Sequence, residues 1–350
     1  MISGRDMAAY QGFLVEARRY WMSDLWRMLR EEYAALSAGR DVKTSQDVAD
    51  ILEPSTTYQY YAWMERHVQR MKYSGRLGLV RRYADERPAG ADQVDNLKLD
   101  PDVPVPRYYA GVDTHQHPGN LLEGAGAGLV YKASATSTQP GATVGYVLHE
   151  RFAAWLEKLG RFERVLDMGC GFGKSTITLA QRFAHAKVEG VDLSAPCLEL
   201  AAAEAAAAKV DNLRYAQADL RRTDYPDAAF DLVTSTMVLH EMDMPAVRDA
   251  LVESHRLLAP GGTVVHLDFR IRDPFLEFIH YGHSRRNNEP FMAPLNEFDV
   301  EGEMRRAGFT DVQAIPFEEA PGATRPDWPT WRFPWTAFVG RRPEGGKDAR

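Results

Sequence analysis

The feature that most constrains this chain is a glycine-rich turn between an apolar run and a helical pattern. Residues 164–175 read RVLDMGCGFGKS, in which a short apolar run ends at Asp167 and glycine stands at every second position from 169 to 173. A helical pattern then continues to Phe183. A strand, a tight turn and a helix N-terminus form the unit with which α/β proteins hold a nucleotide-like ligand at the carboxyl end of a sheet. Glycine lets the backbone approach that ligand closely because it has no Cβ.

Two other glycine patterns do not fit this turn. A dinucleotide fingerprint, G-x-G-x-x-G, requires glycine where Lys174 or Thr176 stands. A phosphate loop, G-x-x-x-x-G-K-[ST], matches at 173–175 but requires its first glycine where Met168 stands. The pattern present is D-x-G-x-G-x-G, starting at Asp167. It suits a ligand that carries a sulfonium and an ammonium but no phosphate.

This pattern resembles the signature of class I S-adenosylmethionine-dependent methyltransferases, and later segments follow that family's order. A second apolar run, 188–192, ends in an acid, and further matching strands lie at 215–220, 230–234 and 263–267. The resemblance implies an α/β fold with a Rossmann-like seven-stranded core, S-adenosylmethionine as cofactor and S-adenosylhomocysteine as product. The positions that it assigns to the cofactor are Asp167, Gly169, Gly171, Gly173, Asp192, Leu193, Asp219 and Leu220.

Each acid in that set has an expected partner. The resemblance places Asp167 near the amino-acid part of the cofactor. An acid at the end of the second strand, here Asp192, can accept hydrogen bonds from both ribose hydroxyls. The resemblance places Asp219 against the adenine amino group.

His240 and Glu241 follow the fourth predicted strand in the run MVLHEM. Their position resembles the His–acid pair of caffeate-type O-methyltransferases, in which the histidine is the base and the acid orients it. This chain departs from that pattern, because Glu replaces Asp and residues 242–244 read MDM where the family has Trp-Ser-Asp. An unperturbed imidazole titrates near pH ~6.5, which makes His240 a competent base. The alternative is a structural or cofactor-side histidine.

The resemblance implies methyl transfer from S-adenosylmethionine to a small-molecule substrate, with oxygen favoured as the methylated atom. Methylation at sulfur, nitrogen or carbon is the alternative within this class. A protein that binds S-adenosylmethionine without methylating is the alternative outside it.

The chain divides into three predicted parts. Residues 1–100 form a helical N-terminal domain, with helices expected over 7–36, 46–52 and 58–73. Their layout resembles the dimerisation domain of caffeate-type enzymes, which implies a homodimer and allows a winged-helix-like fold. Residues 101–144 are predicted as a linker and pocket-covering segment, and residues 145–342 as the methyltransferase domain. An amphipathic helix expected from Val144 to Leu159 leads into that domain.

Two stretches supply candidate substrate contacts. The first is the pocket-covering segment, and the second is the insertion at 268–300, which follows a predicted strand where substrates bind in open α/β folds. The candidates are Tyr108, Tyr109, His117, Tyr131, His280, Tyr281 and Arg285. The pair His115-x-His117 invites a metal interpretation, but no further cluster at ligand spacing supports it, so no metal is predicted.

Composition narrows the partners further. A net charge of −7 and a pI near 5.8 argue against a protein that binds nucleic acid through a basic stripe. No stretch approaches ~20 consecutive apolar residues, and the first residues contain no apolar signal core. The two cysteines have neither metal-type nor redox-type spacing. We therefore predict a cytoplasmic protein without a nucleic-acid or membrane partner.

Overall fold

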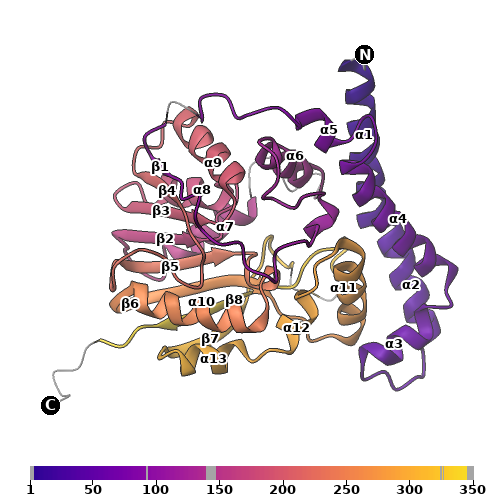
Figure 1. The fold of residues 1–350 in the computed structure, drawn as a ribbon. Coiled ribbons are helices and arrows are strands. Elements are labelled where there is room, and N and C mark those ends of the chain that lie inside the picture. The colour runs from indigo at the N-terminus through magenta and orange to yellow at the C-terminus, as the bar shows by residue number, and fades with distance from the viewer. Residues whose placement is uncertain (1–3, 92–93, 139–146, 324, 326, 345–350) are drawn as a thin grey trace.

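The computed structural model describes residues 4–91, 94–138, 147–323, 325 and 327–344, and its centre is one mixed β-sheet (Figure 1). The strand order is β1-β4-β3-β2-β5-β6-β8-β7, and among the described strands β8 alone runs opposite to the others. The strands span Leu97–Lys98 (β1), Arg164–Met168 (β2), Lys187–Asp192 (β3), Leu213–Gln217 (β4), Phe230–Thr236 (β5), Leu258–Phe269 (β6), Thr310–Pro316 (β7) and Trp335–Arg341 (β8).

Strands β2 to β8 confirm the predicted seven-stranded Rossmann-like core. The direction in which the sheet grows reverses between β2 and β5, and ligands bind at such a switch point in open α/β sheets. The two-residue strand β1 is an addition, because only helices were predicted within residues 1–100. Leu97 pairs with Tyr215 of β4, and Leu97 packs with Val94 against the buried core. That apolar contact explains why an otherwise irregular segment covers the edge of the sheet.

Helices cover both faces of the sheet. Helices α7 (Val147–Leu156), α8 (Lys174–Arg182) and α9 (Ala195–Ala207) pack on one face, and α10 (Met244–Leu257) and α13 (Val300–Arg306) on the other. Buried alanines of α9 let its backbone approach the sheet closely. The predicted start of α7 at Val144 lies outside the described residues.

The N-terminal region is helical, as predicted. In Figure 1 its long helices form a column beside the rest of the molecule. The elements are α1 (Gly4–Tyr20), a π-helical turn (Trp21–Leu25), α2 (Trp26–Ser37), α3 (Ser45–Leu52), α4 (Thr56–Tyr73) and α5 (Leu79–Tyr83). A reciprocal capping box between Thr44 and Asp47 fixes the start of α3. The homodimer and the winged-helix-like fold stay predictions.

The insertion after β6 joins this column to the core. It forms α11 (Pro274–Asn287) and α12 (Met292–Glu297). Phe275, Phe278 and Ile279 of α11 share one buried apolar cluster with residues of α1 to α4 and with Trp331, which is fully buried. The N-terminal helices thus pack on elements of the methyltransferase half. The predicted boundaries at residues 100 and 144 stay predictions, and the second lies outside the described residues.

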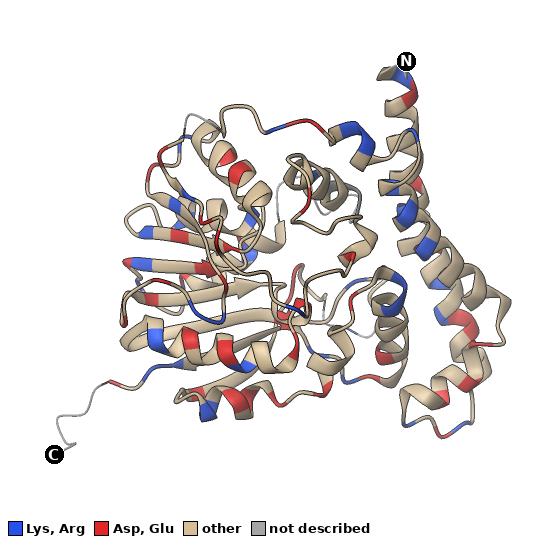
Figure 2. Ribbon diagram, viewed as in Figure 1, with Lys and Arg blue, Asp and Glu red and all other residues tan. Residues whose placement is uncertain are grey.

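Charged side chains of both signs are interspersed along the N-terminal helices (Figure 2). None of the helices in the described ranges combines the length and the apolar character that a membrane span requires.

Candidate functional site

The turn between β2 and α8 has the backbone conformation that its glycines predict. Gly169, Gly171 and Gly173 have φ values of +72°, +52° and +82°. A Cβ added to Gly169 would lie 2.3 Å from a methyl carbon of Val238, and one added to Gly173 would lie 2.5 Å from the Tyr215 hydroxyl. The two outer glycines are therefore required by packing. The loop at the middle one, with Cys170 and Phe172, lines a cavity.

Asp167 lies behind this turn and is fully buried. Its Oδ2 accepts hydrogen bonds from the hydroxyls of Ser175 and Thr176 in the first turn of α8, the latter at 2.7 Å. Burial raises the pKa of this carboxyl to about 6 despite those bonds. Its Oδ1 has no partner within the described part of the chain. A buried acceptor without a partner is uncommon, and a donor from a bound ligand would satisfy it.

Asp192 ends β3 and braces the same turn. Its Oδ2 accepts a hydrogen bond from the backbone N–H of Gly171, and its Oδ1 accepts one from Ser194, both at 2.8 Å. Burial raises the pKa of this carboxyl. The neighbouring Leu193 carbonyl accepts a hydrogen bond from Gln217 of β4 at 2.9 Å. These bonds hold the ends of β3 and β4 next to the glycine turn.

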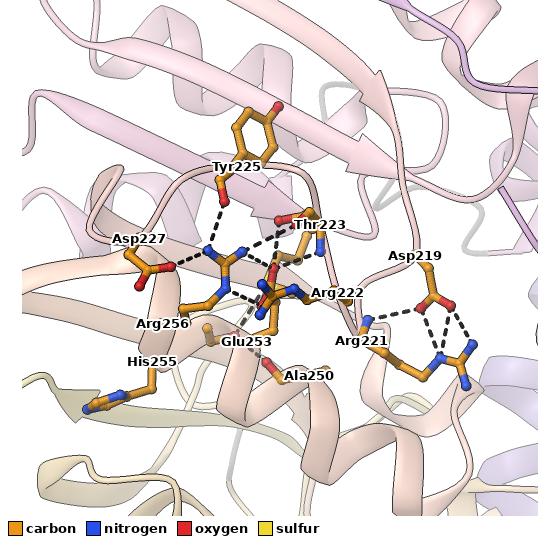
Figure 3. Close-up of polar contacts among 12 residues, drawn as sticks. Asp219, Arg221, Arg222, Thr223, Tyr225, Asp227, Ala250, Glu253, His255 and Arg256 are labelled. Carbon is orange, nitrogen blue, oxygen red and sulfur yellow. Dashed lines mark hydrogen bonds and ion pairs between the residues drawn. The ribbon is translucent and has the colours of Figure 1, made fainter. Parts of the chain in front are cut away.

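Asp219 follows β4 and is paired within its own loop. The backbone N–H of Arg221 donates to Oδ1 of Asp219 at 2.9 Å, and its guanidinium donates to Oδ2 at 2.6 Å (Figure 3). Leu220 between them is buried. Figure 3 also shows Arg256 of α10 bound to Glu253 at 2.6 Å and to Asp227 at 2.7 Å. The connection between β4 and β5 is thus fixed on α10, which sets the position of Asp219.

A cavity of about 580 Å³ extends from the glycine turn to the N-terminal helices. Its walls come from the turn, from the ends of β5 and β6, and from α1, α4 and α11. Aromatic rings form much of its lining, at Tyr73, Tyr131, Phe172, Phe269, Trp328, Trp331, Phe333 and Trp335. The cavity therefore combines the predicted cofactor turn with a largely apolar compartment that the N-terminal helices help to close.

His240 lines this cavity and is oriented by an acid that sequence reasoning missed. Its Nδ1 lies 2.9 Å from Oδ1 of Asp268, a buried residue in β6. Oδ2 of Asp268 accepts a hydrogen bond from the Leu239 backbone at 2.8 Å. The signal for Asp268 was an acid near the end of an apolar strand, the same signal that singled out Asp167 and Asp192.

Glu241 lies between two imidazoles. Its Oε1 is 3.5 Å from Nε2 of His240 and 3.2 Å from Nε2 of His115. Burial alone would lower the pKa of His240, but Asp268 and Glu241 outweigh it and raise that pKa well above its usual value. Burial also lowers the pKa of His115, but Glu241 and Glu289 outweigh it and raise that pKa to about 10. The carboxylates around both imidazoles therefore favour their protonated forms, and the base role of His240 stays a prediction.

The predicted contacts in the pocket-covering segment lie in different surroundings. Tyr131, on α6 (Ala127–Thr138), lines the cavity, with its ring 5.3 Å from that of Phe172. Tyr108 packs edge-on against Phe291, and Tyr109 is partly buried, where burial and then Glu241 and Asp192 raise the pKa of its hydroxyl. His117 is buried against the Tyr73 ring and does not line the cavity.

Helix α11 presents other residues to the cavity than those predicted. His280 is fully buried beside Trp331 and Phe333, the Tyr281 hydroxyl accepts a bond from Asn296 at 3.0 Å, and Arg285 is exposed. His283 and Asn287, one helical turn apart, line the cavity instead. The sequence did not define this helix, so its cavity-facing side was not predictable. Across the described ranges, no three His, Cys, Asp or Glu side chains are grouped so that they could hold a metal ion.

The strand order, the switch point and the glycine turn together define an α/β domain of the class I methyltransferase type. The methyltransferase domain family matches residues 165–262. This part of the chain is a class I S-adenosylmethionine-dependent methyltransferase domain, as the glycine motif predicted. The cofactor of the class is S-adenosylmethionine, and its product is S-adenosylhomocysteine.

Several curated methyltransferases are similar to this chain over part of their length. Phosphoethanolamine N-methyltransferase 1 of Arabidopsis thaliana is 33% identical over 156 residues, which cover 43% of this chain and 30% of that protein. Demethylmenaquinone methyltransferase of Thermus thermophilus is 36% identical, covering 31% and 47%. Trans-aconitate 2-methyltransferase of Deinococcus radiodurans is 33% identical, covering 40% and 46%. The chain thus spans less than half the length of these relatives.

Solved structures show a weaker likeness. An O-methyltransferase family protein from Burkholderia thailandensis has a TM-score of 0.47 at 18% identity, covering 61% of each chain. Phosphoethanolamine N-methyltransferase 2 of Haemonchus contortus, in complex with S-adenosyl-L-methionine, has a TM-score of 0.42 at 19% identity, covering 60% of this chain and 59% of that one. Because both scores lie below 0.5, the fold assignment rests on the strand order.

Proposed function

We propose that this protein transfers the methyl group of S-adenosylmethionine to an oxygen atom of a small molecule bound in the cavity. The observation that carries the proposal is that the glycine turn and His240, which Asp268 orients, line one cavity. A hydroxyl acceptor must lose its proton, and an imidazole oriented by a buried carboxylate is suited to accept it. The aromatic lining would hold an acceptor with an apolar body.

The residues present fit the cofactor. The glycine turn lines the cavity, and Asp192 lies at the end of the adjacent strand. Asp167, directly behind the turn, keeps one buried oxygen without a partner in the described part of the chain. When bound, S-adenosylmethionine supplies an electrophilic methyl group. The contribution of the chain is to position the acceptor and the cofactor, since in-line displacement depends on alignment. We assign Asp192 and Leu193 to the ribose, and Asp219 and Leu220 to the adenine.

Proton transfer to His240 requires its neutral form. Glu241 and Asp268 favour the protonated imidazole, so the proposed base becomes competent only as the pH rises. Glu241 is therefore assigned the role of holding His240 and His115 in place.

A second candidate is methylation at an atom that needs no base, such as an amine nitrogen or a sulfur. The observation that favours it is that both ring nitrogens of His240 face carboxylates. The names of the relatives include an N-methyltransferase as well.

The test is to incubate the purified chain with S-adenosylmethionine and pools of small acids, phenols, amines and thiols. S-Adenosylhomocysteine and the methylated product are then identified by mass spectrometry. Product methylated at oxygen supports the proposal, and product methylated only at nitrogen or sulfur favours the second candidate. Product methylated only at carbon would contradict both. Binding of S-adenosylhomocysteine by calorimetry without turnover in any pool would favour a protein that binds the cofactor without methylating.

The N-terminal helices also support a proposed homodimer. Phe13 on α1 and Trp63 on α4 expose 55% and 56% of their surface, so both are accessible to a second copy of the chain. Light scattering of the wild type and of a Phe13→Ser, Trp63→Ser variant tests it, and a monomeric wild type would contradict it.

A further inference from the structure

His115 lies between two carboxylates that come from different elements. Its Nε2 is 3.2 Å from Oε1 of Glu241, after β5, and its Nδ1 is 2.9 Å from Oε1 of Glu289, after α11. Glu289 is only 4% exposed at its side chain, whereas the His115 side chain keeps 27% of its surface exposed and lines the cavity. The imidazole is thus fixed at its edges while part of the ring faces the cavity.

The same ring is connected to the glycine turn. The rings of His115 and Tyr131 are nearly parallel, with centroids 6.3 Å apart. Tyr131 in turn meets the turn itself, since a Cβ added to Gly171 would lie 3.4 Å from its Cε1. His115 therefore lies one aromatic ring away from the backbone that we assign to the cofactor.

The backbone of His115 adopts a conformation that packing must maintain. Its φ is +56°, and that of the next residue, Gln116, is +60°. For residues with a side chain, this left-handed conformation is sparsely populated and persists where surrounding structure holds it, often at functional sites. Gln69 of α4 donates to the His115 carbonyl at 2.8 Å, and Gln116 donates to the Arg286 carbonyl of α11 at 2.7 Å. Helices α4 and α11 therefore hold His115 in place.

The series of paired acids and imidazoles that includes His115 continues to helix α4. Glu289 lies 3.7 Å from Nε2 of His283, whose Nδ1 contacts Glu65 of α4. Glu65 is buried and also accepts from Arg286. Four acids and three imidazoles thus alternate from β6 to the N-terminal helices. Helices α1 and α4 lie outside residues 165–262, which match the methyltransferase domain family, and yet they form part of the cavity wall.

We propose that His115 is a residue of the methyl-transfer site, facing the reacting end of the cofactor and the acceptor, and that Gln69 of helix α4 positions it. This inference rests on the proposed function. It assigns a part in forming the site to the N-terminal helices, which lie outside both the glycine motif and the matched domain.

The test compares S-adenosylmethionine with S-adenosylhomocysteine, which lacks the methyl group and the positive charge of the sulfonium. Calorimetry at pH 7 gives the ratio of the two affinities for the full chain. In His115→Asn, loss of a positive charge that faces the sulfonium should raise the preference for S-adenosylmethionine about twofold or more. Asn tolerates the left-handed conformation, and His115→Gly is the second variant should the first not fold.

Two further variants complete the design. Gln69→Ala should change the ratio in the same direction, by a smaller factor, while leaving the imidazole in the chain. His67→Asn removes an exposed imidazole from α4, the helix that carries Gln69, so the affinity ratio of this variant should equal that of the wild type.

An unchanged ratio in His115→Asn or His115→Gly overturns the assignment of His115. An unchanged ratio in Gln69→Ala, with a changed one in the His115 variants, overturns the positioning role. Failure of the wild type to bind either ligand would instead refute the proposed function.

Discussion

Nδ1 of His240 lies 2.9 Å from Oδ1 of Asp268, although the two residues are 28 positions apart in the sequence. The pair forms because β5 and β6 are parallel neighbours, so the segments at their carboxyl ends meet. Asp268, and not only the adjacent Glu241, therefore orients His240. Substitutions of Asp268 and of His240 should therefore both affect proton transfer from an acceptor.

The first prediction concerns pH. Carboxylates raise the pKa of His240 well above its usual value, so the protonated, inactive form persists through neutral pH and turnover should increase as the pH rises. In Asp268→Asn that pKa falls, and the rise should move to lower pH. The measurement is a pH–rate profile at saturating cofactor with an acceptor from the pools. Profiles that coincide for the two proteins would contradict a base role for His240.

The second prediction concerns the size of the effect at His240. Removal of a general base typically lowers the rate constant by ~10²–10⁴-fold. His240→Ala should therefore reduce kcat by about that factor, with the calorimetric affinity for S-adenosylhomocysteine nearly unchanged. Full turnover of this variant would contradict the base role and favour methylation at an atom that needs no base.

The third prediction concerns Asp192. Its carboxylate braces Gly171, and hydrogen bonds to charged groups contribute ~1.5–3 kcal/mol each. Asp192→Ala should weaken S-adenosylhomocysteine binding by about tenfold or more. Asp211→Ala, an exposed acid between α9 and β4, serves as the control. Equal dissociation constants for the Asp192 variant and the wild type would refute the ribose assignment.

The fourth prediction concerns Gly169. A Cβ there meets Val238 at 2.3 Å and the residue has a φ of +72°. Gly169→Ala should lower the free energy of unfolding by roughly 1–3 kcal/mol. Gly12→Ala, at an exposed position of α1 with no atom within 4 Å of the new Cβ, should instead be neutral or stabilising. Chemical denaturation distinguishes the two. Equal stability of Gly169→Ala and the wild type would show that the turn can relax.

The fifth prediction concerns Glu65. Burial opposes ionisation, but Arg286 and His283 outweigh it and lower the pKa of this carboxyl to about 2. Because this folded-state pKa lies below the unfolded value, the stabilisation is complete above about pH 4.5 and is lost as the pH falls toward 2. Glu65→Gln should be less stable than the wild type at pH 7, by roughly 3–5 kcal/mol.

The difference between Glu65→Gln and the wild type should shrink between pH 4.5 and 2, measured by urea denaturation. Glu53→Gln, at the exposed end of α3, is the control. A difference independent of pH would show that the loss comes from packing and not from the charge.

The sequence by itself determined the methyltransferase half of the fold. Apolar runs, glycines and the acids at strand ends are local patterns, and their spacing placed β2 to β8, the turn at Gly169 to Gly173, and Asp192 in the right order. The N-terminal helices followed from apolar periodicity in the same way. Strand β1 did not, because two residues show no periodicity and their pairing depends on where β4 lies.

The cavity was decided only by the tertiary structure. The sequence singled out His117, and not His115, as a candidate substrate contact. In the structure the left-handed backbone at His115 turns that side chain toward Glu241, whereas His117 packs on Tyr73. Glu65 and His283 are 218 residues apart and meet only because α11 packs on α4. The raised pKa of His240 likewise follows from neighbours brought in by other elements. Local spacing determines secondary structure, but burial and electrostatic environment arise from contacts between segments far apart in the chain, and these set the chemistry of the site.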